Sequence, residues 1–130
     1  MLTFIVLVAG TLVTGAGPHA GDVSAPRLNI AVAKVATFHG FLVVALILLT
    51  IAGIYKKFPN FRHDSQRYLV VFLAIALLQG IIGYAQYLLA VPEGLVAAHL
   101  LGSSILWIAA WRVRLTQYYT FETNNTLEQK

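Results

Sequence analysis

Hydrophobic positions in this chain gather into long runs separated by short polar segments. Three runs contain no charged residue: VATFHGFLVVALILLTIAGIY after Lys34, YLVVFLAIALLQGIIGYAQYLLAVP after Arg67, and GLVAAHLLGSSILWIAAW after Glu93. Each is close to the roughly 20 residues that a helix rising about 1.5 Å per residue needs to cross the apolar core of a bilayer. The pattern therefore predicts three membrane-spanning helices.

A fourth hydrophobic run, LTFIVLVAGTLVTGAG, stands at the start of the chain and is shorter than the others. A signal peptide is the alternative, but the run lacks a basic region before it and an A-x-A-type site after it. We interpret it as a transmembrane helix whose beginning is cut short. The expected helices lie near 2–17, 33–55, 68–91 and 94–113, and their short connections make neighbours antiparallel. The predicted fold is all-α, a polytopic membrane protein built as an antiparallel four-helix transmembrane bundle over residues 1–113.

The basic residues predict how this bundle is oriented. The segment 56–67, KKFPNFRHDSQR, carries four Lys or Arg residues, and three more follow the last span. The opposite side has only Arg27 and Lys34. Because Lys and Arg stay on the cytoplasmic side, we expect a plasma-membrane protein of a prokaryote with both termini in the cytoplasm. Residues 114–130 are then a polar cytoplasmic tail, and its last segment TFETNNTLEQK (120–130) is expected to be a frayed end.

Composition agrees with a lipid environment and excludes several kinds of function. Of the 130 residues, 58% are hydrophobic and 11% charged, with a mean hydropathy of +0.76, whereas soluble domains are about one quarter charged. The net charge of +4 comes from basic residues that flank the spans, which argues against nucleic acid as a partner. The chain has no cysteine, so a disulfide, a thiolate metal site and a cysteine nucleophile are excluded.

Two histidines lie inside the predicted spans, where an ionisable side chain is costly and needs a partner. His39 follows Lys34 by five residues and His99 follows Glu93 by six, so both lie roughly 7–9 Å inside the same membrane face. The spans contain no acidic residue to pair with them. Two imidazoles at one depth, on helices that run in the same direction, can supply both axial nitrogens of one heme iron. The alternative is a histidine that only hydrogen-bonds to a neighbour.

Small and polar residues accompany these histidines. Gly102 lies one turn beyond His99, and Gln79 and Gly83 share one face of the third helix. We expect these three residues to line the face of a flat ligand. The alternative is that glycine faces, including that of Gly10 on the first helix, only let membrane helices pack closely.

Three segments carry a resemblance to a known family: TLVTGAGPHAGD (11–22), LLQGIIGYAQY (77–87) and PEGLVAAHLLGSSILW (92–107). They resemble the C-terminal half of the heme A synthase family, over residues 8–111. The resemblance implies an enzyme of two related four-helix halves, each with histidines on its second and fourth helices, that oxidises a methyl group of heme O to the formyl group of heme A. It also implies that His39 and His99 are the axial ligands of a heme b cofactor.

The polar connector GAGPHAGD (15–22) matches the family's pattern after the first helix of this half. Its glycines and proline break the helix and turn the chain at the membrane surface. Arg27 and Lys34 are the cations on this side, and we expect them to pair with heme propionates. Lys34 can instead extend to the lipid headgroups. His19 in the connector and His63 in the basic loop are expected in water rather than on the metal.

One feature of the family's N-terminal half, a glutamate one turn before the second-helix histidine, has no counterpart here. The four residues before His39 are VATF. We therefore expect this chain to supply the heme b half of a heme A synthase, together with a second four-helix half or as a homodimer. Two other classes stay open. One is a small membrane cytochrome b that transfers electrons or serves oxidase assembly, and the other is an assembly protein without heme. No catalytic residue is assigned.

Overall fold

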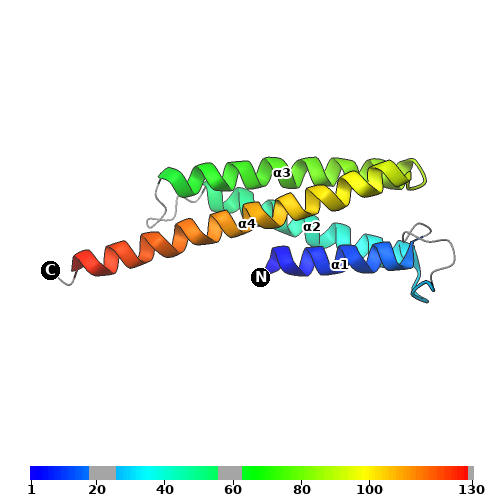
Figure 1. Cartoon of the computed structure of the whole chain (residues 1–130), viewed down its shortest axis with the longest axis horizontal. Coiled ribbons are helices and arrows are strands. Elements are labelled where there is room, and N and C mark those ends of the chain that lie inside the picture. The colour runs from blue at the N-terminus through cyan, green and yellow to red at the C-terminus, as the bar shows by residue number, and fades with distance from the viewer. Residues whose placement is uncertain (18–25, 56–62, 129–130) are drawn as a thin grey trace.

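The computed structural model describes residues 1–17, 26–55 and 63–128 and, within the last of these segments, the side chains of 66–117. Its four helices are α1 (Leu2–Ala16), α2 (Val32–Tyr55), α3 (His63–Leu88) and α4 (Glu93–Glu128). Figure 1 shows them side by side along one long axis. The predicted all-α fold with four helices is confirmed.

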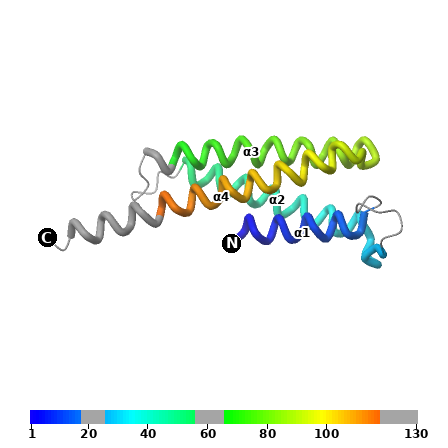
Figure 2. Tube along the Cα trace, in the orientation of Figure 1, coloured from blue at the N-terminus to red at the C-terminus, as the bar shows by residue number. Residues whose placement is uncertain are grey.

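The helices form two hairpins that lie against each other. Among the described residues, α1 contacts α2, α2 contacts α3, α3 contacts α4, and α4 closes the arrangement on α1. No contact joins α1 to α3 or α2 to α4 within this described part, so each of these pairs occupies opposite corners of the bundle. Figure 2 shows that α3 and α4 lie side by side near the turn that joins them and that α4 is inclined to α3. Chain direction alternates, and α2 therefore runs parallel to α4.

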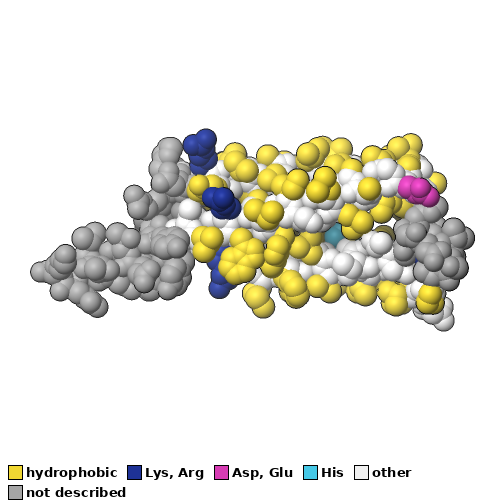
Figure 3. Space-filling view, viewed as in Figure 1, with side chains coloured by type: hydrophobic (Ala, Val, Ile, Leu, Met, Phe, Trp, Pro, Cys, Tyr) yellow, Lys and Arg dark blue, Asp and Glu magenta, His cyan; other side chains and the backbone are white. Residues whose placement is uncertain are grey.

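Three of the helices are long and apolar enough to cross a membrane. They are the segments Val32–Tyr55, Gln66–Leu88 and Glu93–Gln117, whereas α1 is a shorter apolar helix of 15 residues. Figure 3 shows a broad hydrophobic surface, with Lys and Arg side chains at one end of the bundle and an acidic side chain at the other. This distribution is typical of a protein whose sides contact lipid and whose ends contact water.

Two helix boundaries differ from the sequence prediction. The last helix was expected to end near 113, but α4 continues to Glu128 through most of the expected tail, so a frayed tail was wrong. No Gly or Pro follows Gly102 in the chain, and nothing in the polar segment therefore interrupts the helical hydrogen bonds. The third helix begins at His63, before the predicted residue 68, and ends at Leu88 rather than 91.

Tight backbone turns end α1 and α3. The Gly17 N–H donates to the Thr14 carbonyl at 3.1 Å, which ends α1. After α3, Ala90 and Val91 adopt φ angles of 56° and 62°, a left-handed conformation that is strained for residues with a Cβ. The Val91 N–H donates to the Gln86 carbonyl at 2.8 Å, so the chain reverses within a few residues and α4 starts beside α3.

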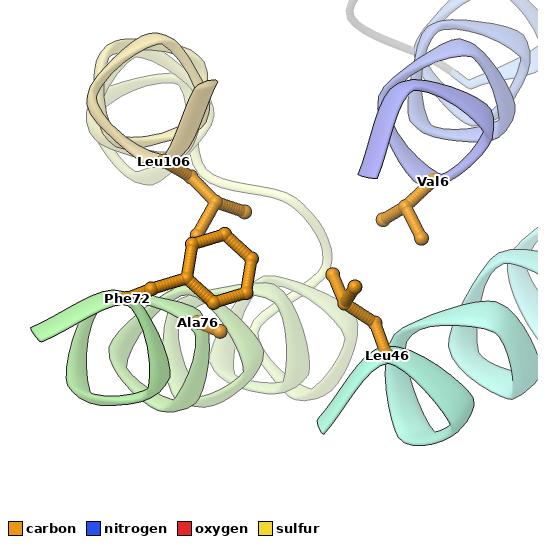
Figure 4. Packing of buried hydrophobic residues seen from close by; sticks show 5 residues of the cluster. All are labelled: Val6, Leu46, Phe72, Ala76 and Leu106. Atoms are coloured by element: carbon orange, nitrogen blue, oxygen red, sulfur yellow. The ribbon is translucent and has the colours of Figure 1, made fainter. Parts of the chain in front are cut away.

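The packed core lies in one half of the bundle and draws on all four helices. Figure 4 shows the side chains that meet there: Val6, Leu46, Phe72, Ala76 and Leu106. In this half α1 also contacts α4, since the ring centroids of Phe4 and Trp107 are 6.1 Å apart. Lipid tails are as apolar as these side chains, so the core stabilises the bundle through close van der Waals packing rather than through removal from water.

Candidate functional site

The two intramembrane histidines lie at the same level of the bundle. His39 is seven residues after the first residue of α2, and His99 is six residues after the first residue of α4. Both side chains are half-buried. Their helices, α2 and α4, occupy opposite corners of the bundle. The structure thus places the histidine pair that the sequence singled out at one level, on two helices that run in the same direction.

Each histidine ring rests against a glycine of the preceding helix. A Cβ built on Gly10 of α1 would lie 3.3 Å from Cε1 of His39, and one built on Gly83 of α3 would lie 3.3 Å from Cε1 of His99. The absence of a side chain at these two positions lets the rings approach the neighbouring helix. Gly83 was expected near the ligand, whereas sequence reasoning assigned Gly10 no more than a packing role. A glycine on the preceding helix at the depth of each histidine is the signal that could have found it.

Polar atoms without partners gather around the pair. Nδ1 of His39, Nδ1 of His99 and Oε1 of Gln79 are buried and have no hydrogen-bond partner among the described residues. Buried polar atoms are nearly always hydrogen-bonded or metal-bound. The two ring nitrogens lie at one level and the amide oxygen about one turn below, so the described bundle has polar atoms there to which a further group can bind.

Gln79 and Gly102 form the floor beneath this level. The Gln79 side chain is 7% exposed, and a Cβ on Gly102 would overlap its amide nitrogen. Only glycine at position 102 leaves room for a buried amide between α3 and α4. Both residues were predicted to line the ligand, and the structure brings them together one turn below His99.

Burial divides the described bundle into two halves at this floor. We call residues 10–16, 32–45, 80–88 and 93–101 the histidine end, and residues 1–9, 46–55, 66–79 and 102–117 the core end. Buried side chains occur throughout the core end, but no described residue of the histidine end is buried. Figure 3 shows a histidine side chain at the bottom of a recess between two rows of hydrophobic side chains. The histidine end of the described bundle is therefore less tightly packed than the core end.

The two predicted propionate partners are placed differently. Arg27 is half-buried in the segment that leads into α2, beside Leu28, whose Cδ1 approaches Gly15 at the end of α1. Lys34 lies on the outward face of α2, where it lines a shallow surface groove with Phe38 and Phe41. These aromatic neighbours are 58% and 78% exposed. This position favours the alternative in which Lys34 extends toward the lipid headgroups.

The remaining histidines are not part of the described site. His19 lies outside the described residues, together with most of the polar connector. His63 is the first residue of α3 rather than a loop residue, and it stands at the opposite end of that helix from Gly83. Their predicted exposure to water remains a prediction.

The donor set limits which metal group suits this site. Among the residues with described positions, no cluster of three or more His, Cys, Asp or Glu side chains is present. A macrocycle that brings its own equatorial nitrogens needs only two axial donors. The histidine pair and the glycines beside the rings fit a heme.

Comparisons with known proteins give no relative for this chain. No family model matches it, and neither a curated protein nor a solved structure matches it either.

Proposed function

We propose that this chain is a membrane heme protein that holds one heme b between His39 and His99. The observation that carries the proposal is the placement of two histidines at one level, on helices at opposite corners of the bundle, in the half where no described side chain is buried. In a membrane, two histidines without an acidic neighbour are costly unless they share a partner. An iron atom between them removes that cost.

Each surrounding residue has a distinct part in this proposal. The imidazoles of His39 and His99 would hold the iron, and Gly83 and Gly102 give room to the side chains of His99 and Gln79. Arg27 is the candidate for an ion pair with a propionate at the outer face. A bis-histidine heme supplies one-electron transfer when bound. The hydrophobic helices keep bulk water away from it.

We further propose that the chain works as the heme b half of a heme A synthase-type oxidoreductase. The support is the set of segments that resemble that family, with His39 and His99 at the positions of its ligands. The acidic residues of the chain all lie outside the hydrophobic runs, so the carboxylate expected for oxidation of heme O must come from a partner. A second four-helix half or a second copy of the chain is the partner we expect, in a prokaryotic plasma membrane with both termini inside.

The same lack of an intramembrane carboxylate supports a second candidate function. A chain with one histidine pair and no acidic residue in its spans suits a small membrane cytochrome b, which transfers electrons without its own catalysis. The two candidates share the heme site and differ only in whether heme O is converted.

Expression of the chain in membranes tests these proposals in two steps. We expect a reversible low-spin optical spectrum, and acid extraction of the porphyrin should give heme b. A chain that carries no heme would refute the site. Heme O is then added to membranes with this chain alone and with a partner half that contains the carboxylate. Heme A formed only with the partner supports the synthase role, none in either case supports the cytochrome, and conversion by this chain alone contradicts the assignment as a cofactor half.

A further inference from the structure

The two helical hairpins each place a glycine against the histidine ring in the same way, and the His39 ring is also hydrogen-bonded to the backbone of Val6. In the α1–α2 hairpin, a Cβ on Gly10 would meet Cε1, Nδ1 and Nε2 of His39 at 3.3, 3.7 and 3.8 Å. In the α3–α4 hairpin, a Cβ on Gly83 would meet Cε1, Nε2 and Nδ1 of His99 at 3.3, 3.8 and 3.9 Å. In both hairpins the nearest ring atom is the carbon between the two nitrogens. Each ring therefore presents the same edge to the glycine of the helix before it.

Other glycines in the described helices lack this relation. A Cβ on Gly80 or Gly94 would have no atom within 4 Å, and one on Gly53 would touch only Leu69 at 3.9 Å, whereas one on Gly15 or Gly102 would meet Leu28 or Gln79 rather than a histidine. Close packing of membrane helices would use small residues wherever backbones approach. Gly10 and Gly83 instead make room for one particular side chain each, and in both cases it is the proposed ligand.

We propose that Gly10 and Gly83 are positioning residues that set the planes of the His39 and His99 imidazoles. The proposal rests on the proposed heme site, because the planes matter chemically only when both rings bind one iron. The terminal torsion of histidine has a broad energy profile, so the ring plane is decided by what the ring packs against. A Cβ on either glycine would lie 3.3 Å from Cε1 of the facing ring, and the room left by its absence selects one orientation of that ring. A methyl group there requires the ring to move by a few tenths of an ångström or to tilt.

Each ring plane is set within its own hairpin. Gly10 and His39 belong to α1 and α2, whereas Gly83 and His99 belong to α3 and α4. The angle between the two rings then depends on how the hairpins are placed relative to each other, and a change at one glycine alters one ring only. This independence gives the proposal a sharp test.

The first test uses the full chain without heme, in detergent micelles, with carbon-13 at Cε1 of its histidines. Gly10→Ala should shift the NMR signal of His39 and leave that of His99 in place, and Gly83→Ala should do the reverse. Gly53→Ala and Gly80→Ala add the same methyl group to α2 and α3, where it would meet only Leu69 at 3.9 Å or no atom within 4 Å, and they should shift neither signal. Assignments come from His39→Gln and His99→Gln.

The outcomes separate positioning from a general packing effect. A shift of the facing histidine alone supports the proposal. A loss of bundle packing would shift both histidine signals together, and that result would overturn it, as would two unchanged signals. Circular dichroism of each variant verifies that the helix content is retained.

The second test uses the heme-loaded protein. The electron paramagnetic resonance spectrum of a ferric bis-imidazole heme depends on the angle between the imidazole planes. Gly10→Ala and Gly83→Ala should therefore move the largest g value while the heme content stays the same, and the two control variants should keep the wild-type spectrum. Unmoved g values would overturn the role of these glycines at the heme. A wild-type chain that binds no heme would refute the proposed site, and the NMR result would still decide whether the glycines set the ring planes.

Discussion

The core end and the histidine end are formed by the same four helices but differ in how closely their side chains pack. In the core end, side chains from all four helices are buried against one another, with Phe72 at 4% and Leu106 at 5% exposure. In the histidine end, none of the described side chains is buried, although the same helices continue through it. Helices in lipid associate through close packing rather than through exclusion of water. The four helices therefore associate mainly through packing in the core end, and the histidine end is the less closely packed end, where we propose that a ligand binds.

The comparison also explains where polar groups are placed. In the core end the Thr50 hydroxyl donates to the Leu46 carbonyl at 2.7 Å, so this buried oxygen is satisfied within its own helix. At and above the floor, the Gln79 amide oxygen and both histidine Nδ1 atoms have no partner within the described chain. The Thr14 hydroxyl of the histidine end also donates within its own helix, so the atoms without a partner are those of the two imidazoles and the Gln79 amide rather than of one end as a whole.

The largest expected effect comes from removal of a histidine and concerns the histidine end alone. His39→Ala or His99→Ala should abolish low-spin heme, because loss of one strong ligand leaves the iron weakly bound on one side. Wild-type protein with hemin at about 100 times its Kd should gain roughly 2.7 kcal/mol of stability, and either variant should gain none. Optical spectra and thermal unfolding in detergent measure both effects. His63→Ala serves as the control, and an unchanged spectrum in His39→Ala would end this interpretation.

The next effect concerns the core end and separates buried from lipid-facing aromatic residues. Phe72→Ala should lower the free energy of unfolding by roughly 2–3 kcal/mol, because it leaves a cavity among packed side chains. Phe41→Ala makes the same change at a side chain that is 78% exposed, and it should change stability by less than about 0.5 kcal/mol. Thermal or denaturant unfolding in detergent compares the two variants. Equal losses would show that the division between the two ends is wrong.

A smaller effect is expected at the floor between the two ends. Gly102→Ala places a methyl group on the Gln79 amide and should destabilise the heme-free protein by about 1–2 kcal/mol through overpacking. Gly94→Ala, at a position with no atom within 4 Å, is the matched control. The double variant Gln79→Ala with Gly102→Ala should recover part of the loss, because the clashing amide is gone. If the double variant loses as much stability as the two single variants together, then Gln79 and the methyl group at position 102 do not interact, and the predicted clash is wrong.

The smallest effect concerns the turn that closes the histidine end. Ala90→Gly should stabilise the protein by up to about 1 kcal/mol, since φ of 56° is strained for alanine and open to glycine. The same substitution at Ala97, inside α4, should destabilise by about 1 kcal/mol because glycine is a poor helix former. Opposite shifts of the thermal midpoint are the expected result. Two shifts of the same sign would contradict the strained turn.

Much of the fold follows from the sequence because hydropathy is read along the chain. Charge-free runs of sufficient length predicted the long helices, and α2 begins and ends within one residue of its predicted bounds. The depth of His39 and His99 also follows from counting residues along each helix, since the rise per residue is constant. The end of α4 could not be predicted from the sequence, because a polar segment without Gly or Pro is compatible both with a helix and with a frayed tail.

The sequence by itself therefore determined which segments are helical, which of them are long enough to cross a membrane, and at what depth the histidines lie. The tertiary structure decided that α2 and α4 stand at opposite corners, that Gly10 rests on His39, and that Lys34 faces outward. The physical reason is that these helices are apolar on every side, so no amphipathic pattern indicates which face points inward. Rotation and neighbours are set by the fit of small and large side chains between helices, and that fit exists only once the bundle is assembled.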